Sequence, residues 1–272
     1  MSSTVSSVLA LSGLIPFEAK ILLTHVLGCD RAWLAAHGDA QLTREQVKTF
    51  EALARRRRDG EPVAYLTGRR EFFGLDLEVT PDVLIPRPET ELLVEQALLW
   101  IGTDAPAHVL DLGCGSGAVA LAIAHERPLV RVLGVDVAPA AVELAQRNAT
   151  RLDIKNVAFV VADWFDGVPS EKFEVIVGNP PYVGEDDPHL EAGDLRFEPP
   201  VALTPGHDAL AAIRTIIDAA PEYLVSHGAL ALEHGHDQSQ STQALLSSAG
   251  FVEVRSLRDL AGIPRVTSGR MR

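Results

Sequence analysis

Hydrophobic and polar positions repeat with helical spacing in the first part of the chain. Leu22 and Val26 fall on the same face of one helix. Thr43 and Gln46 have the spacing of a capping box, which marks the start of another helix. Residues 1–70 are therefore expected to form a small helical domain.

Four consecutive arginines, Arg55 to Arg58, end the second of these helices. Cations suit the negative end of a helix dipole, so a solvated helix end is the favoured interpretation. Contact with an acidic or RNA partner is the alternative.

The pattern then changes to a period of two. Phe73, Leu75, Leu77 and Val79 alternate with polar residues or glycine, as in a half-buried strand. A proline-rich connector follows, and Thr90 stands where it would cap the next helix. A β-hairpin and linker are expected over residues 71–90.

From His108 onward, short apolar runs alternate with helical patterns, which is typical of a parallel sheet in an α/β fold. The expected strands are residues 109–112, 132–135, 159–162, 173–177, 229–232, 251–257 and 266–269. The expected helices include residues 118–126, 139–151 and 208–223. Residues 91–272 are thus expected to form one domain around an open, mostly parallel sheet, with a binding loop or lid between Gly184 and Gly206.

Composition narrows the functional classes. The 272 residues carry a formal net charge of −13, which argues against a protein that grips nucleic-acid backbone over a large surface. Cys29 and Cys114 suggest neither a disulfide framework nor a zinc site, and no metal is expected. We expect no signal peptide and no membrane-spanning run, and a reducing cytoplasm fits the cysteine usage.

A glycine-rich segment, Asp111-Leu112-Gly113-Cys114-Gly115-Ser116-Gly117-Ala118, ends one expected strand and opens a helix. Its spacing satisfies the G-x-G-x-x-G/A pattern, and Asp136 ends the next strand where an acid would bind a ribose. A dinucleotide-dependent oxidoreductase is therefore a real alternative. Asp111 favours S-adenosylmethionine instead, because a carboxylate would attract an ammonium group and oppose a pyrophosphate.

Two further strand ends support that cofactor. Asp163-Trp164 would offer an acceptor and an aromatic face to an adenine ring. Asn179-Pro180-Pro181-Tyr182 ends the fourth strand, where a stiff Pro-Pro unit must leave the sheet. The Asn179 oxygen and a proline carbonyl form two acceptors for a planar NH2 group, with Tyr182 beside it. This pattern suggests chemistry on an amino or amide nitrogen.

Taken together, these residues resemble a class I S-adenosylmethionine-dependent methyltransferase, and more closely the HemK/PrmC family, the N5-glutamine methyltransferases of peptide chain release factors. The most specific part of the resemblance is Ile85-Pro86-Arg87-Pro88-Glu89-Thr90-Glu91. Further shared segments are Leu66–Gly68, Arg70–Phe72, Asp163–Phe165, Arg196–Pro199 and Leu232–Gly235. The resemblance implies a seven-stranded sheet and methylation of the glutamine in the release factor's Gly-Gly-Gln motif, which modulates translation termination.

The resemblance also implies roles for particular residues. S-adenosylmethionine, released as S-adenosylhomocysteine, would contact Asn179 and the residues of three strand ends: Gly113, Cys114, Gly115, Ser116, Gly117, Asp136, Asp163 and Trp164. The substrate carboxamide would lie against Asn179, Pro180, Pro181 and Tyr182, with Asn179 and Tyr182 as the catalytic pair. His234, His236 and Asp237 are interpreted as capping and packing residues.

Three other functions stay open at this point. The Asn-Pro-Pro-Tyr motif also occurs in enzymes that methylate amino groups of nucleic-acid bases, which would need a basic substrate face. A glutamine methyltransferase of a ribosomal protein would be expected to lack the Pro-Glu-Thr part of the connector. A non-catalytic cofactor-binding regulator is disfavoured, because an intact Asn179–Tyr182 motif gives it no evident advantage. Release factors are the expected partner, without a direct nucleic-acid substrate or a membrane.

Overall fold

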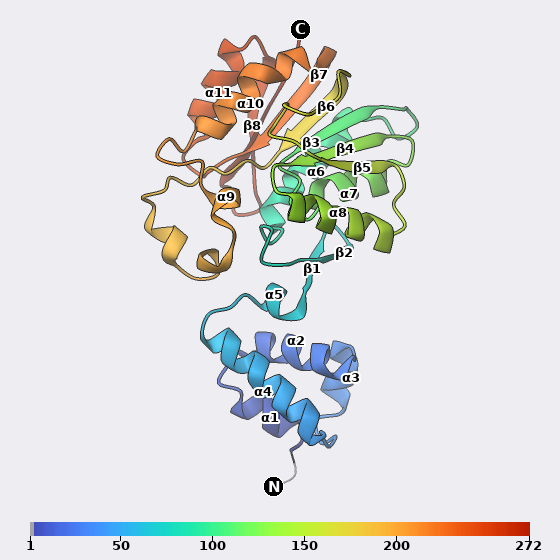
Figure 1. The fold of residues 1–272 in the computed structure, drawn as a ribbon, viewed down its shortest axis with the longest axis vertical. Helices are drawn as coiled ribbons and strands as arrows, with labels where there is room; N and C mark the ends of the chain where they lie inside the picture. The colour runs from blue at the N-terminus through green and yellow to red at the C-terminus, as the bar shows by residue number, and fades with distance from the viewer. Residues whose placement is uncertain (1–2) are drawn as a thin grey trace. The chain divides into compact units, whose positions relative to one another are not determined.

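The computed structural model describes residues 3–272, which divide into two compact units (Figure 1). The smaller unit comprises the described residues up to Arg69 together with Glu191–Phe197. The larger unit comprises Arg70–Leu190 and Glu198–Arg272. A short segment from the middle of the chain therefore belongs to the helical unit.

The smaller unit is helical, as the apolar spacing predicted. Its helices are α1 (Val5–Leu11), α2 (Pro16–Leu27), α3 (Arg31–Ala36), α4 (Arg44–Arg58), α5 (Val63–Thr67) and the 3-10 turn η3 (Leu195–Phe197). The Thr43 side chain accepts from the backbone of Gln46 and the Gln46 side chain accepts from the backbone of Thr43, which is the predicted capping box. Fully buried Leu22, Leu23 and Phe50 form the centre of this unit's own core.

The arginine cluster is solvated in part, as the sequence favoured: Arg55, Arg56 and Arg58 are exposed at the helix end, whereas Arg57 is largely buried. Arg57 pairs with Glu18 and Asp194 at 2.8 and 2.9 Å, and its side chain is only 19% exposed. Arg56 pairs with Glu61, and Arg58 donates to the carbonyl of Ser12. These guanidinium groups bind acceptors in addition to their favourable interaction with the helix dipole. Ser12 and Glu61 follow α1 and α4, whereas Glu18 is in α2 and Asp194 precedes η3.

The linker region forms a hairpin of β1 (Arg69–Phe72) and β2 (Leu75–Glu78). The alternating run from Phe73 was expected to be one strand, but Phe73 and Gly74 form the turn. Both have positive φ, 49° and 77°, which is what a two-residue hairpin turn requires. Because Gly74 favours a turn, the alternating run begins its strand at Leu75 rather than at Phe73.

A seven-stranded sheet is the centre of the larger unit, in the order β5-β4-β3-β6-β7-β9-β8. The first five strands in this order are parallel, and β9 is antiparallel to both β7 and β8. The strands are β3 (His108–Leu112), β4 (Arg131–Asp136), β5 (Val157–Val161), β6 (Phe173–Gly178), β7 (Leu224–Glu233), β8 (Val252–Arg258) and β9 (Pro264–Arg270). The predicted fold class is confirmed.

Helices cover both faces of this sheet (Figure 1). Val109 and Val175 pack in one core cluster with α6, α7 and α8, whereas Leu110 and Ile176 pack in the other with α10 and α11. Neighbouring strand residues point to opposite faces, which explains the apolar runs without alternation. The helices and 3-10 turns are η1 (Pro88–Thr90), α6 (Glu91–Trp100), α7 (Ala118–Glu126), α8 (Pro139–Arg151), η2 (Pro188–Glu191), α9 (Pro200–Leu203), α10 (Ala211–Ala219), η4 (Ala220–Glu222) and α11 (Ser239–Ser248).

Candidate active site

A cavity of about 460 Å³ lies in the larger unit at the carboxyl ends of β3, β4 and β6. Nine of the predicted site residues line it: Gly113, Cys114, Gly115, Ser116, Asp136, Asp163, Trp164, Asn179 and Pro181. Gly117, Pro180 and Tyr182 are not among the lining residues. Ligands of open α/β sheets bind at this edge, where neighbouring parallel strands end.

The glycine loop is shaped by its backbone. The N–H groups of Gly113 and Cys114 both donate to the carbonyl of Val135, at 2.9 and 2.8 Å, which ties the loop to β4. Gly113 has φ +73°, a conformation that disfavours any side chain. Gly117 has φ +84°, and a Cβ there would lie 3.0 Å from the Phe159 ring. Gly117 therefore allows α7 to pack closely on the sheet rather than facing the cavity.

Asp136 organises the loop from the end of β4. Its two carboxylate oxygens accept from the N–H groups of Gly115 and Ala138, each at 2.9 Å. Burial raises the pKa of Asp136, and these backbone hydrogen bonds oppose that rise. The carboxylate is thus held by the backbone at the cavity wall, where further acceptor sites remain for ligand hydroxyls.

Asp111 lies in the same wall but is 2% exposed. Its Oδ2 accepts from the N–H of Ala120 in the first turn of α7, at 3.0 Å. Burial, with a contribution from the Asp136 charge, raises the pKa of Asp111 to about 7. The residue that the sequence assigned to attracting an ammonium group therefore also anchors α7.

Asp163 and Trp164 follow β5 in a tight turn. The N–H of Asp163 donates to the carbonyl of Asp166, and the reverse bond is also present. Trp164 has φ 51°, a left-handed conformation that is strained for a large side chain. Such strain concentrates at binding sites, and here it occurs where the tryptophan faces the cavity.

Asn179 is oriented by a residue far away in the sequence. Its Nδ2 donates to the Thr90 hydroxyl at 3.3 Å. Within residues 3–272 no hydrogen bond reaches its Oδ1, so the oxygen is available as an acceptor. Thr90 was expected to cap α6, but its side chain makes no cap hydrogen bond because the helix continues from the 3-10 turn η1.

Tyr182 lies behind the cavity wall. Its hydroxyl donates to Glu233 Oε1 at 3.1 Å, and its carbonyl accepts from Gln238 Nε2 at 3.0 Å. Burial and the adjacent Glu233 carboxyl raise the pKa of Tyr182. The same burial raises the pKa of Glu233 to about 7, while the hydroxyls of Thr90 and Tyr182 lower it.

Glu198 supports the site from behind the cavity wall, a role that the sequence motifs did not predict. It is 4% exposed, pairs with Arg87 and accepts from the N–H of Ile85 at 3.1 Å. Glu198 thereby supports the Leu84–Arg87 wall of the cavity. Both partners lie in segments that the family resemblance singled out, Arg196–Pro199 and Ile85–Glu91. A glutamate between a phenylalanine and a proline gives no sequence signal that its charge is buried.

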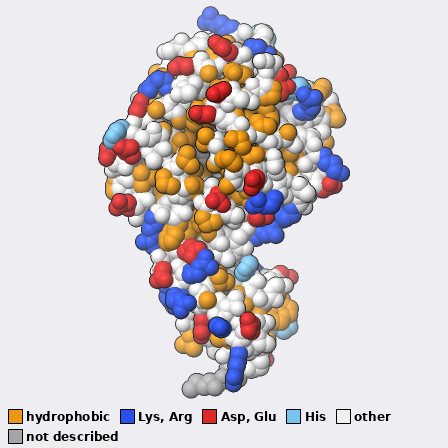
Figure 2. Space-filling model, viewed as in Figure 1, with side chains coloured by type: hydrophobic (Ala, Val, Ile, Leu, Met, Phe, Trp, Pro, Cys, Tyr) orange, Lys and Arg blue, Asp and Glu red, His pale blue; other side chains and the backbone are white. Residues whose placement is uncertain are grey.

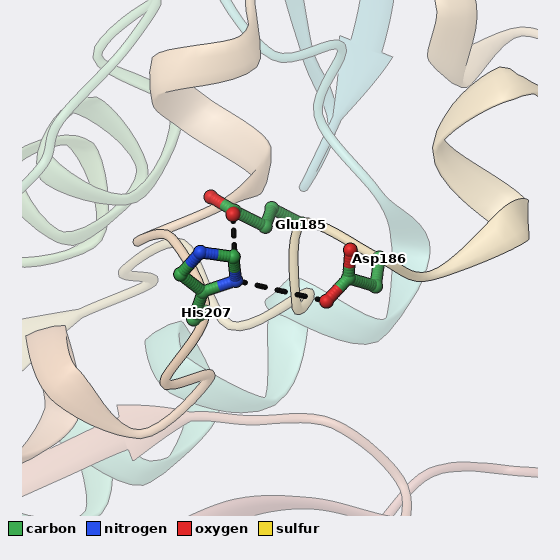
Figure 3. A group of neighbouring side chains, drawn as sticks. All are labelled: Glu185, Asp186 and His207. Carbon is green, nitrogen blue, oxygen red and sulfur yellow. Dashed lines mark ion pairs between the residues drawn. The ribbon is translucent and has the colours of Figure 1, made fainter.

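His234 packs as expected, with its Nε2 against the Thr267 hydroxyl at 2.7 Å. A separate cluster, Glu185, Asp186 and His207, has donor atoms within 4.8 Å of one another (Figure 3). All three side chains are exposed, so water competes for any cation and the cluster is too open to define a metal centre.

Charged side chains of both signs occur on the face drawn in Figure 2. Figure 2 shows acidic and basic side chains interspersed on one face, with hydrophobic side chains gathered over the middle of the larger unit. The half-exposed Val137 and Val201 border the cavity. No helix in the described part of the chain is long and apolar enough to cross a membrane.

Two family models match the chain. The PrmC N-terminal domain matches residues 5–68, and the methyltransferase small domain matches residues 89–195. Release factor glutamine methyltransferases of Xylella fastidiosa and Escherichia coli are each 49% identical over 93% of this chain, covering 92% and 91% of their own lengths. The Burkholderia pseudomallei protein of the same name is 49% identical over 99% of this chain and 96% of its own.

Solved structures are similar in fold. A methyltransferase from Pyrococcus furiosus aligns with a TM-score of 0.53 and 20% identity, covering 73% of this chain and 89% of that one. A T. thermophilus 16S rRNA N2 methyltransferase, in complex with AdoMet and guanosine, aligns with a TM-score of 0.55 and 21% identity over 75% of this chain and 50% of that one. At these identities the likeness concerns the fold alone.

Proposed function

This chain belongs to the release factor glutamine methyltransferase family, and on that premise we propose that it methylates the side-chain amide nitrogen of the glutamine in the Gly-Gly-Gln motif of release factors, with S-adenosylmethionine as methyl donor. The proposal also places the protein in the cytoplasm, where its two free cysteines, Cys29 and Cys114, stay reduced.

The residues of the cavity fit that cofactor. The loop Gly113–Ser116 lets the backbone approach a ligand closely, Asp136 offers acceptors to ribose hydroxyls, and Trp164 offers an aromatic face. We propose that these groups hold the methionine, ribose and adenine parts, with Asp163 beside the adenine. When bound, the cofactor supplies an electrophilic methyl group and leaves as S-adenosylhomocysteine.

The single observation that carries the substrate assignment is the orientation of Asn179. Its NH2 group is bound to Thr90, its oxygen has no hydrogen-bond partner among the described residues, and Asn179 lines the cavity. We propose that this oxygen and the Pro180 carbonyl accept the two N–H groups of the substrate carboxamide, while Pro181 and Tyr182 shape the pocket. An amide nitrogen is a poor nucleophile, and two acceptors would stabilise the positive charge that develops on it during transfer.

The proposed roles require no dedicated base, because the nitrogen loses its extra proton after transfer. A base-modifying enzyme would need a basic substrate face, whereas this chain carries a net charge of −13. We therefore propose that no nucleic acid is methylated.

The test is incubation of the protein with methyl-labelled S-adenosylmethionine and, in parallel, release factor, ribosomal proteins or total RNA. We expect label on the glutamine of the Gly-Gly-Gln motif, located by mass mapping of peptides. A release factor with glutamate at that position is the control, because a carboxylate has no nitrogen to accept the methyl group. Label in RNA or in a ribosomal protein instead would refute the assignment.

A further inference from the structure

Three buried polar atoms in α6 and β9 lack hydrogen-bond partners. They are Gln96 Nε2 on α6, and Ser268 Oγ and Arg270 Nε on β9, and none has a partner within residues 3–272. The side chains of Gln96 and Ser268 are each 1% exposed. A buried polar atom without a partner costs free energy and is rare in native proteins, so these atoms call for a physical reason.

Strand register brings these side chains to one face of the sheet. Ser268 and Arg270 lie two and four positions after Val266, which packs in the core cluster that contains α6, so they point to the same face. Arg255 on β8 is the cross-strand partner of Ser268 and shares that face. Its Nη2 donates to Gln96 Oε1 at 3.3 Å, which joins the two strands to the helix. Gln96, Arg255, Ser268 and Arg270 are named the α6–β9 cluster below.

The α6–β9 cluster offers hydrogen-bond donors and positive charge. Because a guanidinium group only donates, the bond from Arg255 fixes the oxygen of Gln96 and leaves its NH2 group as an unused donor. Arg270 Nε is also a donor, and the Ser268 hydroxyl can donate or accept. Neither Arg255 nor Arg270 makes an ion pair with another residue of the described chain, although the protein has 37 acidic side chains. The unused groups therefore match an acceptor that carries negative charge.

We propose that the α6–β9 cluster is a binding site for a small oxyanion, a phosphate or a carboxylate. The anion oxygens accept from Gln96 Nε2, Ser268 Oγ and Arg270 Nε, and the charge pairs with both guanidinium groups, whose planar fork fits either anion. A water molecule would satisfy the donors but leave both positive charges unpaired. Arg255 is exposed on the terminal strand β8, which gives an anion access from solvent. None of the four residues lines the cavity, so the site goes beyond the proposed methyl transfer.

Titration of the unmodified protein is the first test. In protein labelled with 15N-arginine, the Nε–H resonance of Arg270 is assigned by its loss in Arg270→Lys. We expect it to shift saturably with inorganic phosphate or with acetate, at an ionic strength held constant with sodium chloride. A response to phosphate alone identifies phosphate as the ligand, and a response to acetate alone identifies a carboxylate. If neither anion causes a saturable shift, the proposal is wrong and water fills the site.

Two arginine variants separate a defined site from a general effect of charge. Arg255→Met should weaken binding of phosphate or acetate roughly tenfold or more, because a charge-assisted hydrogen bond is lost. Arg258→Met is the matched control, since it removes the same charge from the same strand and Arg258 donates to the carbonyl of Gly262. Calorimetry should give an affinity within about twofold of the unmodified protein for this control. Equal weakening in the two variants overturns the site, because it indicates diffuse attraction of anions by surface charge.

Discussion

Asn179 and Asp136 both line the cavity but differ in how their side chains are hydrogen-bonded. Both carboxylate oxygens of Asp136 accept from backbone N–H groups, one from Gly115 in the glycine loop and one from Ala138 just before α8. These bonds fix its position without a ligand. Asn179 is tied only through its nitrogen, which leaves its oxygen for the substrate. Their substitution should therefore separate cofactor binding from methyl transfer.

We predict that Asn179→Ala lowers single-turnover methylation by roughly a hundredfold or more, because a positioned hydrogen bond to the transition state is lost. Its affinity for S-adenosylmethionine should stay nearly the same. Asp136→Ala should instead weaken the binding of S-adenosylmethionine, by about 1.5–3 kcal/mol, as expected for the loss of hydrogen bonds to a charged group. Calorimetry and rapid-quench assays measure the two effects, and equal losses in both variants would contradict the division of roles.

At the scale of elements, the cavity wall is supported by an ion pair between the fully buried Glu198 and the partly exposed Arg87. Glu198 accepts from Ile85 and pairs with Arg87, so the segment before α9 holds the connector before α6. Ile85 and Arg87 lie just before the 3-10 turn η1, and Glu198 lies between η3 and α9, so the three residues stand outside helices and strands. The wall residues Leu84, Pro86 and Arg87 owe their positions to a residue more than a hundred positions later in the chain.

We predict that Glu198→Ala destabilises the protein by about 2–4 kcal/mol, because the Ile85 N–H loses its buried acceptor and the partly exposed Arg87 loses its ion pair. Cofactor affinity should also fall, since the released connector lines the cavity. Chemical denaturation and calorimetry measure these changes. Glu126→Ala at the exposed end of α7 is the control, with an expected effect of about 0.5 kcal/mol or less. Equal effects of the two substitutions would show that the wall does not depend on the pair.

For the whole molecule, local sequence signals predicted where several helices begin and end, but they did not predict contacts between residues far apart in the sequence. Helices α7 and α8 begin and end where the sequence predicted, because glycine and proline mark their starts. By contrast, β7 begins at Leu224 rather than at the predicted residue 229. The polar Ser226 and His227 interrupt the apolar pattern in its first half, so the pattern did not reveal the true start. The pairing of Thr90 with Asn179 joins positions that no spacing rule connects.

The same difference explains the arginine cluster. Its place at the end of α4 was predictable from the helix dipole, whereas its acceptors come from elsewhere in the chain. Glu191–Phe197 lies between two segments of the larger unit in sequence but belongs to the smaller unit. Only the fold shows that Arg57 reaches Asp194 within that segment. The organisation of the chain into two units thus depends on a contact that the sequence pattern does not reveal.

We predict that Arg57→Met destabilises the smaller unit by roughly 2–4 kcal/mol, because Glu18 and Asp194 lose a shared, mostly buried cation. Arg57 also donates to the carbonyls of Gly60 and Glu61, so the turn after α4 loses its anchor as well. Hydrogen exchange should accelerate in Glu191–Phe197, and urea denaturation should show the lower stability. Arg55→Met is the matched control, since Arg55 is exposed and its side chain makes no ion pair among the described residues. If both variants exchange at the same rate in Glu191–Phe197, the segment is held by other contacts.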